Sequence, residues 1–437
     1  NKVDRSVTGK VAMQQTCGIL QLPLNNLGVM ALDFVSGKGI GTAVGHAPGI
    51  ALIDPAAGSR MAVAESLLNL VWAPLTHGLK GVSLSANWMW PAKNSGENAR
   101  LYAAVEALSD FVCALGINVP TGKDSLSMTQ KYPDGSMVIS PGTVIVSAVA
   151  EVEDIVKTIS PAVKAETGSL VYKIEFSAAP AALGGSALAQ VLNQLGATTP
   201  DVDDVNRFVQ TFAAVQELIQ KELILSGHDV SSGGMITTLL EMCFPTPGAG
   251  MEISFPAGTN EAILFAEHPS VIIQVSKENS GIVESVLNRQ NTRYQLIGSV
   301  NESASLQLNG LSAGHTIDIA AMRSVWFSTS ARLDALQRSS AHAKRRETNI
   351  FKQPLEYLFP AGFDGTFKSI GANPMRRNSS GIRAAIIREK GVNGDREMAY
   401  ALYIAGFDVK DVHMTDLVSG RADLSDVNMI VFVGGFS

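Results

Sequence analysis

The segment that most constrains the fold of this chain is residues 53–72, with the sequence IDPAAGSRMAVAESLLNLVW. Asp54 is a residue type that caps helix N-termini well, and Pro55 is favourable at the first helical position. Because neither proline nor glycine follows Gly58 in this segment, we expect one helix that runs through Leu70. Its expected packing face consists of Ala62, Val63, Ser66, Leu67 and Leu70.

Two polar residues of this helix, Glu65 and Asn69, are four positions apart. They therefore lie one helical turn apart on the same face. Together they offer a carboxylate and an amide oxygen to one point, which suits a hard cation such as Mg²⁺. A solvated glutamate and a structural asparagine on a core helix would produce the same pattern.

Length and charge narrow the class of protein. The chain has 437 residues, enough for two or three domains with cores of their own. A net charge of −6 argues against a nucleic-acid or anionic-membrane partner. The apolar runs are far shorter than the ~20 residues that span a bilayer. Cys17, Cys113 and Cys243 form no CxxC pair, which indicates a cytoplasmic protein without a disulfide frame or a zinc site.

The first part of the chain has mixed patterns. Short apolar stretches in residues 6–32 predict paired strands, and residues 81–90 alternate as in a strand. The glycine-rich segment 36–49 matches neither common nucleotide-loop motif, so a flexible hairpin or bulge is expected. Residues 99–115 predict an amphipathic helix, and residues 138–150 predict one or two buried strands.

The segment 120–128, PTGKDSLSM, has only a superficial similarity to a Walker A loop. The first glycine is misplaced at Gly116, and Asp124 stands where a Mg²⁺-binding Ser or Thr is required, so we reject that motif. We expect a polar loop instead. Lys123, with Ser85 and Asn87 of the preceding strand, is a candidate for a substrate site or an interface. A hydrogen-bond network at strand ends explains the same residues.

Residues 159–169 are rich in proline, charge and serine and predict a domain boundary. A strand at 170–176 and helices opened by Gly184-Gly185-Ser186 and at 205–221 follow. The segment 227–234, GHDVSSGG, then precedes a helix through Met242. Backbone N–H groups at that helix start suit phosphate oxygens, and Asp229 beside them fits a shared cation. A plain N-cap with a glycine turn explains the spacing equally well.

The C-terminal part changes in style. Strands and a helix are expected up to residue 319 and a surface helix at 321–337, and residues 339–380 read as a linker or draped segment. From Ile382 onward, a buried strand, a helix, a second strand and the strand MIVFVGGFS follow each other. This alternation is typical of the opening of a doubly wound α/β domain.

Six segments, in this order, resemble the family of large, single-chain phosphoribosylformylglycinamidine synthases, the purine-pathway amidotransferases. They are SLSANWMW (83–90), PTGKDSLSM (120–128), LGGSALAQ (183–190), GHDVSSGG (227–234), VNGDREMAYAL (392–402) and VGGFS (433–437).

The resemblance implies an α/β and α+β architecture. It places an aminoimidazole-ribonucleotide-synthetase-like N-terminal domain at 1–160, its C-terminal partner at 161–330 and a linker at 331–380. The truncated start of a flavodoxin-like class I amidotransferase domain would occupy 381–437. The implied activity of the whole enzyme is the ATP- and glutamine-dependent conversion of formylglycinamide ribonucleotide to the amidine. The chain is then a fragment whose partners are an upstream synthetase half and a downstream glutaminase domain.

The resemblance also implies the residues of a magnesium-nucleotide site. Position by position, Glu65, Asn69 and Asp229 would bind Mg²⁺, and Asn25 and Ser231 would contact ATP or ADP, held structurally rather than turned over. Asn26 stands where the family commonly has an aspartate ligand. An amide brings no charge, so metal affinity should be weaker.

The amidotransferase part lacks the residues for its own chemistry. That reaction needs a cysteine nucleophile, and no cysteine follows Ile382. His413 comes too early to be its partner base and is expected at the surface, whereas Gly434 and Gly435 resemble an oxyanion loop. We therefore expect the chain alone to be inactive. The alternatives are another ATP-using member of the aminoimidazole ribonucleotide synthetase superfamily and a non-catalytic bracing module.

Overall fold

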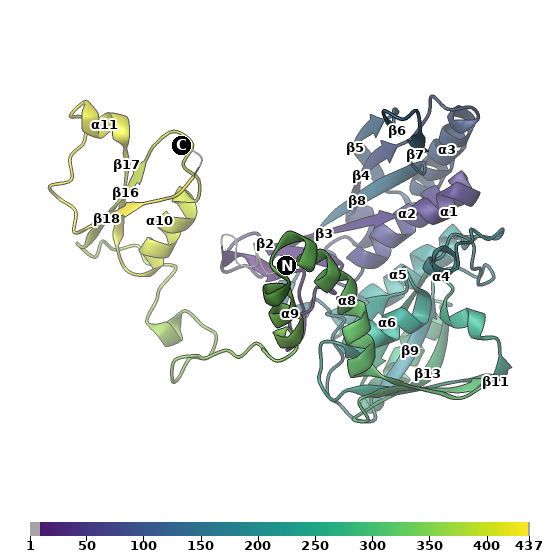
Figure 1. Cartoon of the computed structure of the whole chain (residues 1–437). Helices are drawn as coiled ribbons and strands as arrows, with labels where there is room; N and C mark the ends of the chain where they lie inside the picture. Colours follow the sequence, from purple (N-terminus) through teal and green to yellow (C-terminus); the bar gives the residue numbers. More distant parts are fainter. Residues whose placement is uncertain (1–8, 436–437) are drawn as a thin grey trace. The chain divides into compact units, whose positions relative to one another are not determined.

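The computed structural model describes residues 9–435 and divides the chain into two compact units, Asn1–Leu355 and Glu356–Ser437 (Figure 1). Each unit is described by itself. The expected strand start at Ser6 and the end of the VGGFS motif at Ser437 lie outside the described residues. Within residues 9–435, no helix has the length and apolar character needed to cross a membrane.

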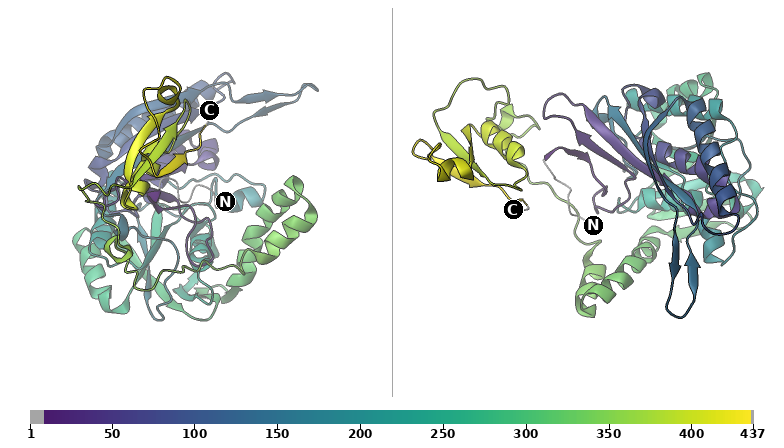
Figure 2. Two further views of the ribbon diagram at one scale, coloured as in Figure 1. Left: turned by 90° about the vertical axis from the view of Figure 1, so that its left-hand side faces the viewer. Right: turned by 90° about the horizontal axis from the view of Figure 1, so that it is seen from above.

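The first sheet of the larger unit has six strands in the order β1-β2-β3-β8-β4-β5. All neighbours are antiparallel except β4 and β5, which are parallel. The strands are β1 (Val11–Met13), β2 (Leu27–Ala31), β3 (Gly39–His46), β4 (Ser83–Met89), β5 (Asn118–Ser125) and β8 (Thr143–Val152). A separate hairpin of β6 (Thr129–Lys131) and β7 (Met137–Ile139) projects from this region (Figure 2).

Three helices belong to the first sheet: α1 (Pro48–Ile53), α2 (Pro55–Leu70) and α3 (Glu97–Leu115). The predicted helix at residues 55–70 is therefore confirmed, with the predicted Asp54 cap. Its packing face is wider than expected, because α2 packs against β3, β8 and α3 and is buried over most of its circumference. A helix buried on nearly all sides has little amphipathic signal to read.

Two predictions for this part are corrected. Only residues 36–38 of the glycine-rich segment lie in the β2–β3 hairpin turn, whereas β3 is a regular strand in the interior of the sheet and Pro48 opens α1. The expected polar loop around Lys123 is instead strand β5, at the edge of the sheet. Its polar sequence is tolerated because an edge strand faces solvent.

The second sheet has seven strands in the order β10-β12-β9-β13-β11-β14-β15, antiparallel except for β11 and β14. They are β9 (Leu170–Glu175), β10 (Ser226–Asp229), β11 (Gly250–Thr259), β12 (Ser270–Val275), β13 (Arg293–Asn301), β14 (Ser305–Leu311) and β15 (His315–Asp318). The associated helices are α4 (Ala187–Val191), α5 (Val205–Gln220), α6 (Gly234–Cys243), α7 (Ser280–Arg289) and α8 (Ile319–Gln337). The helices expected at 205–221 and 321–337 are confirmed. Helix α9 (Ser340–Asn349) was not expected, because its sequence reads as a charged linker.

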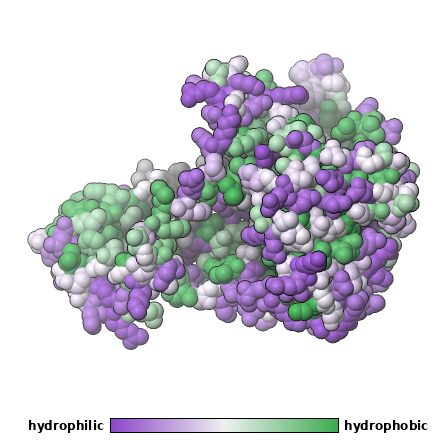
Figure 3. Space-filling view, turned by 90° about the horizontal axis from the view of Figure 1, so that it is seen from below, coloured by the Kyte–Doolittle hydropathy of each residue, from purple (hydrophilic) through white to green (hydrophobic). Residues whose placement is uncertain are grey.

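One hydrophobic core joins the two sheets of the larger unit. Leu67 of α2 and Phe212 of α5 belong to the same cluster of buried side chains. Phe111 of α3 contacts Phe208 of α5 edge-on, with ring centroids 5.8 Å apart. On the face shown in Figure 3, hydrophilic and hydrophobic residues are interspersed over the larger unit.

A buried glutamine also joins the two halves of this unit. Gln216 of α5 donates its Nε2 hydrogens to the carbonyl oxygens of Val71 (2.7 Å) and Ala73 (3.0 Å). Its Oε1 accepts from the backbone N–H of Leu75 at 2.8 Å. The C-terminal end of α2 is thereby satisfied by a side chain from the other sheet's helix.

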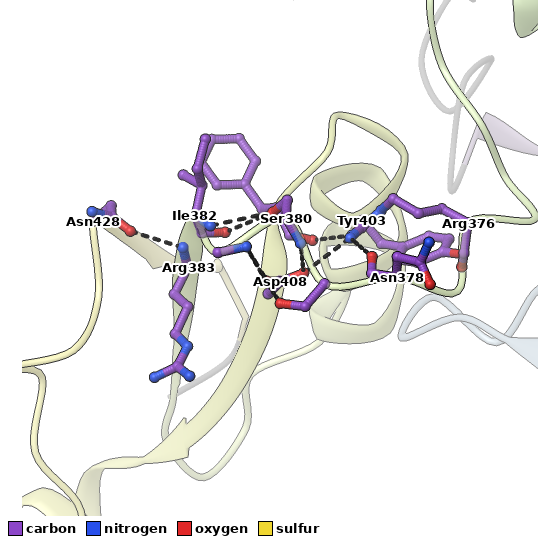
Figure 4. A network of polar contacts seen from close by, with 11 residues as sticks. Arg376, Asn378, Ser380, Ile382, Arg383, Tyr403, Asp408 and Asn428 are labelled. Carbon is purple, nitrogen blue, oxygen red and sulfur yellow. Dashed lines mark hydrogen bonds and ion pairs between the residues drawn. The ribbon is translucent and has the colours of Figure 1, made fainter.

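The smaller unit has a parallel three-stranded sheet in the order β17-β16-β18. Its elements are β16 (Arg383–Arg388), α10 (Asp395–Ile404), β17 (Asp408–His413), α11 (Met414–Val418) and β18 (Met429–Phe432). Small apolar clusters lie on both faces of β16, as the predicted doubly wound opening requires. Asp408 anchors the preceding segment: it accepts from the side chain of Arg376 (2.9 Å) and from the N–H groups of Ser380 (3.0 Å) and Gly381 (2.8 Å) (Figure 4).

Candidate functional site

Helix α2 is held at both ends and brings Glu65 to the candidate site. The Asp54 carboxylate accepts from the N–H groups of Ala56 (2.8 Å) and Ala57 (3.0 Å), which is the predicted N-cap. Glu65 lies about one and a half turns before the C-terminal end of the helix and is the one partly exposed residue among those from Met61 to Leu70. The local sequence therefore fixes where this carboxylate emerges.

The close approach of α2 to β3 depends on Gly45. A Cβ atom at this position would lie 2.3 Å from the carbonyl oxygen of Ala62 and 2.3 Å from the nitrogen of Ser66. Only glycine can occupy such a position. Gly45 thus serves packing, which sequence patterns alone did not reveal.

Glu65 and Asn69 of α2 are both tied to the backbone of β3. Glu65 Oε2 accepts from the N–H of His46 at 3.1 Å, and Asn69 Nδ2 donates to the carbonyl oxygen of Val44 at 2.9 Å. Asn69 Oδ1 is buried, and no donor among the described residues reaches it. The structure thus holds Glu65 and Asn69 against the same strand, as their spacing predicts, and leaves the Oδ1 atom of Asn69 without a hydrogen bond among the described residues.

Asp229 ends strand β10 and is almost fully buried. Its Oδ1 lies 3.0 Å from Nδ1 of His228 and accepts from Nδ2 of Asn26 at 3.1 Å. Its Oδ2 is also buried and receives no hydrogen bond from the part of the chain that the structure describes. Asn26 therefore contacts the expected ligand Asp229 directly.

His228 is a second charged group beside this carboxylate, which the sequence did not single out. Its Nε2 lies 3.2 Å from Oε2 of Glu241, so the ring lies between two carboxylates. Burial alone would lower the pKa of His228, but Asp229 and Glu241 raise it well above its ordinary value. Burial would raise the pKa of Asp229, and the neighbouring His228 reverses this and lowers it. The pair is therefore held as an imidazolium and a carboxylate.

Glu65 is in the opposite electrostatic situation. Burial raises its pKa to about 8, the backbone N–H of His46 lowers it, and the charges of Asp229 and Glu267 raise it further. A pKa raised in this way means that the ionised carboxylate lacks a compensating cation. Such perturbed carboxylates are typical of binding sites.

Two adjoining pockets bring the predicted residues together. The first is lined by Glu65, Asp229, Ser231 and Glu267, between α1 and α2 on one side and the segments before α4 and α6 on the other. The second shares Glu65 and Ser231 with the first and adds Asn26, Asn69 and Ser85. Among the described residues that line either pocket there is no lysine or arginine. No group of three or more His, Cys, Asp or Glu residues suited to a metal was found in residues 9–435.

Glu267 is a site residue that sequence reasoning missed. Its Oε1 accepts from the N–H groups of Ala187 (2.7 Å) and Gly233 (2.8 Å), which open helices α4 and α6. Burial raises the pKa of Glu267. The only sequence signal is an acidic residue between the apolar Ala266 and the buried strand β12, which is too weak to identify a site.

The other predicted residues have mixed placements. Asn25 donates from Nδ2 to the carbonyl oxygens of Gln14 (2.6 Å) and Thr16 (3.3 Å) and is not among the residues that line the two pockets. Lys123 lies opposite Asn87 in the β4–β5 pair, is exposed and donates to Ser125 Oγ at 2.6 Å. The nucleotide role of Asn25 and the interface role of Lys123 and Asn87 stay predictions.

In the smaller unit, Gly435 forms a bridge with Val392, and a Cβ on it would lie 2.2 Å from the carbonyl oxygen of Gly391. Gly434 accepts from the N–H of Asn393 at 3.2 Å and has open space beside its α-carbon. Their oxyanion role stays a prediction. His413 is half-buried rather than fully at the surface, because its ring caps α11 by accepting from the N–H of Thr415.

Three family profiles match the chain. The FGAR-AT PurM_N-like domain matches residues 1–151, the C-terminal domain of AIR synthase related proteins matches 166–310, and the CobB/CobQ-like glutamine amidotransferase domain matches 381–437. Their order is the one that the sequence motifs predicted.

Curated relatives match over the whole chain. A probable phosphoribosylformylglycinamidine synthase of Arabidopsis thaliana, described as chloroplastic/mitochondrial, is 38% identical over 444 residues, which is 100% of this chain and 31% of that protein. The phosphoribosylformylglycinamidine synthase of Homo sapiens is 38% identical over 446 residues, 100% of this chain and 33% of that protein. The chain thus spans about a third of the length of these relatives.

Solved structures share the fold. PurL of Thermotoga maritima complexed with FGAR superposes with a TM-score of 0.55 at 12% identity, over 68% of this chain and 48% of that one. The same protein complexed with ADP gives a TM-score of 0.52 at 12% identity, over 71% of this chain and 48% of that one. The predicted fold class, synthetase-like N- and C-terminal domains followed by the start of an amidotransferase domain, is confirmed.

Proposed function

We propose that this chain is the magnesium-nucleotide-binding part of a phosphoribosylformylglycinamidine synthase, similar over its whole length to about a third of those enzymes. The whole enzyme would use ATP and glutamine to convert formylglycinamide ribonucleotide into the amidine. The ordered match of three domain families, with 38% identity to the human protein, supports this assignment over another member of the synthetase superfamily.

The nucleotide would lie in the two adjoining pockets. The observation that carries this proposal is the pair of buried oxygens without hydrogen-bond partners among the described residues, Asp229 Oδ2 and Asn69 Oδ1, close to the under-compensated carboxylate of Glu65. Carboxylate and amide oxygens fit a hard divalent cation. When bound, Mg²⁺ would neutralise these carboxylates and carry the nucleotide phosphates, with Ser231 beside them.

The nucleotide would brace the fold rather than react. The first pocket lies between α1 and α2 and the segments that open α4 and α6, and the second lies between strands of the first sheet and the segment that opens α6. A ligand there would link the two sheets. The proposed partners are a second synthetase half and a complete glutaminase domain in the same protein. The free thiols favour a reducing compartment such as the cytoplasm.

The chain by itself should release no glutamate from glutamine. Glutamine hydrolysis of this type needs a reactive thiolate. Burial raises the pKa of Cys17 and of Cys243 to about 12, so neither thiol ionises near neutral pH. Cys113 is exposed on α3, and among the described residues neither a histidine nor a carboxylate forms a hydrogen bond with its thiol.

Calorimetric titration with ADP, with and without Mg²⁺, tests the proposal. We expect Mg²⁺-dependent binding to the parent chain and a loss of roughly tenfold or more in affinity in Glu65→Gln and in Asp229→Asn. Both changes keep the shape of the side chain and remove its charge. Glu278→Gln, at an exposed position outside the pockets, is the matched control. No binding by the parent chain with Mg²⁺ would contradict the proposal.

A further inference from the structure

Glu267 occupies the position at which the sequence predicts a phosphate. The segment GHDVSSGG offers backbone N–H groups for phosphate at the start of α6. In the structure, the N–H of Gly233 and the N–H of Ala187 both point to Oε1 of Glu267. One carboxylate oxygen therefore takes the donors of two helix starts.

The charged side chains that line the surrounding pocket are mainly acidic. Glu65, Asp229 and Glu267 all line the first pocket, and of its described lining residues none is a lysine or arginine. His228 offsets the charge of Asp229 from within the core, so the repulsion of an incoming phosphate comes from Glu267 and from the ionised form of Glu65. A phosphate without a cation would meet repulsion here, strengthened by the low local dielectric.

We propose that Glu267 determines the specificity of this pocket by excluding metal-free nucleotides, so that only a nucleotide complexed with a divalent cation binds. The inference deepens the proposed nucleotide function and rests on it. A bound divalent cation offsets two negative charges of the phosphates and is itself a positive centre to which Glu267 and Glu65 are attracted. Without the cation, the phosphates could not bind the N–H groups of Ala187 and Gly233, because Glu267 already accepts from both, and the carboxylate of Glu267 would repel them.

The test variant is Glu267→Gln. A glutamine Oε1 can accept the same two N–H groups, so the starts of α4 and α6 stay satisfied while the charge is removed. Thermal unfolding of both proteins verifies that the fold is kept. Glu278→Gln removes one charge from an exposed position and serves as the control.

The readout is the dissociation constant of ADP, measured by calorimetry in EDTA and in excess Mg²⁺. For the parent chain and for Glu278→Gln we expect binding to be at least roughly 100-fold weaker in EDTA. For Glu267→Gln we expect this ratio to fall to about tenfold or less, through tighter binding of metal-free ADP. An unchanged ratio in Glu267→Gln, or a parent chain that binds ADP equally well in EDTA, would overturn the inference and leave the nucleotide site standing. Absence of ADP binding in Mg²⁺ would overturn both.

Discussion

Gly45 of β3 and Ser66 of α2 are in direct backbone contact, because a Cβ atom on Gly45 would lie only 2.3 Å from the Ser66 nitrogen. This contact sets the distance between α2 and the sheet. It thereby allows Glu65 to accept from the N–H of His46.

Gly45→Ala should destabilise the chain and weaken the site. The added methyl group forces α2 away from β3, and overpacking of this kind costs about 1–3 kcal/mol or more. Glu65 then loses its bond to His46, so Mg²⁺-dependent ADP binding should fall as well. Denaturant unfolding and calorimetry measure the two effects.

Gly281→Ala is the control for that change. Gly281 lies in the first turn of α7 and has open space where a Cβ would be placed. Alanine there should leave stability unchanged or raise it by up to ~1 kcal/mol. Equal behaviour of the two variants would contradict the close-packing account of Gly45.

Asn26→Asp should increase the affinity for Mg²⁺ roughly tenfold, because a carboxylate adds charge to the ligand set. In EDTA the same variant should be less stable than the parent, since its carboxylate replaces the amide that donates to Asp229. Thermal unfolding across a Mg²⁺ titration records both effects. Asn26→Ala, which adds no charge, should show only the loss of stability, and a gain in Mg²⁺ affinity by the alanine variant would refute this explanation.

His268 should make the chain sensitive to acid. Burial lowers the pKa of His268 from its ordinary 6.5; its bond to the Ser177 carbonyl and the charge of Glu175 raise it, whereas Lys173 and Arg293 lower it. The stability contribution of the neutral ring is therefore complete above about pH 6.5 and is lost as the pH falls below it toward the lowered pKa.

His268→Gln should flatten this dependence, because glutamine does not titrate. Free energies of unfolding measured from about pH 7.5 to about pH 5 should converge for variant and parent at the acid end, with ~1.4 kcal/mol at stake per unit of pKa depression. His342→Gln, at an exposed position, is the control. Parallel pH profiles for His268→Gln and the parent would count against this role.

Asp408→Ala should release the segment before the smaller sheet. Asp408 accepts from Arg376, Ser380 and Gly381, and alanine removes all of these bonds at once. Trypsin cleavage after the exposed Arg377 should then accelerate about tenfold or more, since cleavage follows the population of the open form. Asp411 lies on the same strand as Asp408 and binds Arg388 of β16. Asp411→Ala is therefore the control and should leave the rate unchanged.

The local parts of the site could be predicted from the sequence. The Asp54 cap, the helix to Leu70 and the spacing of Glu65 and Asn69 depend on neighbours within a few positions. The turn and helix start after Asp229 are local in the same way. Each of these features follows from capping, helical period or glycine conformations.

The features that could not be predicted from the sequence depend on contacts with distant segments. Position 45 must be glycine because the backbone of Ser66 packs against it across the interface between sheet and helix. Glu267 belongs to the site because it accepts from the N–H of Gly233, 34 positions away. Strand β5 is stable because β4 offers it a parallel partner, which its own polar residues conceal. The periodicity of each segment cannot predict these features, because they depend on which distant segment packs against it.

Gln216, which binds the backbone that follows α2, also has a consequence for folding during synthesis. Gln216 follows Leu75 by 141 positions, and at 5–20 residues per second a ribosome needs about 7–28 s to synthesise that interval. The first sheet is complete once β8 ends at Val152, and until Gln216 has been made the carbonyl groups of Val71 and Ala73 still lack their partner. We therefore expect the first domain to gain part of its stability only when the second has emerged, and a stop codon placed between them should yield a product that depends on chaperones.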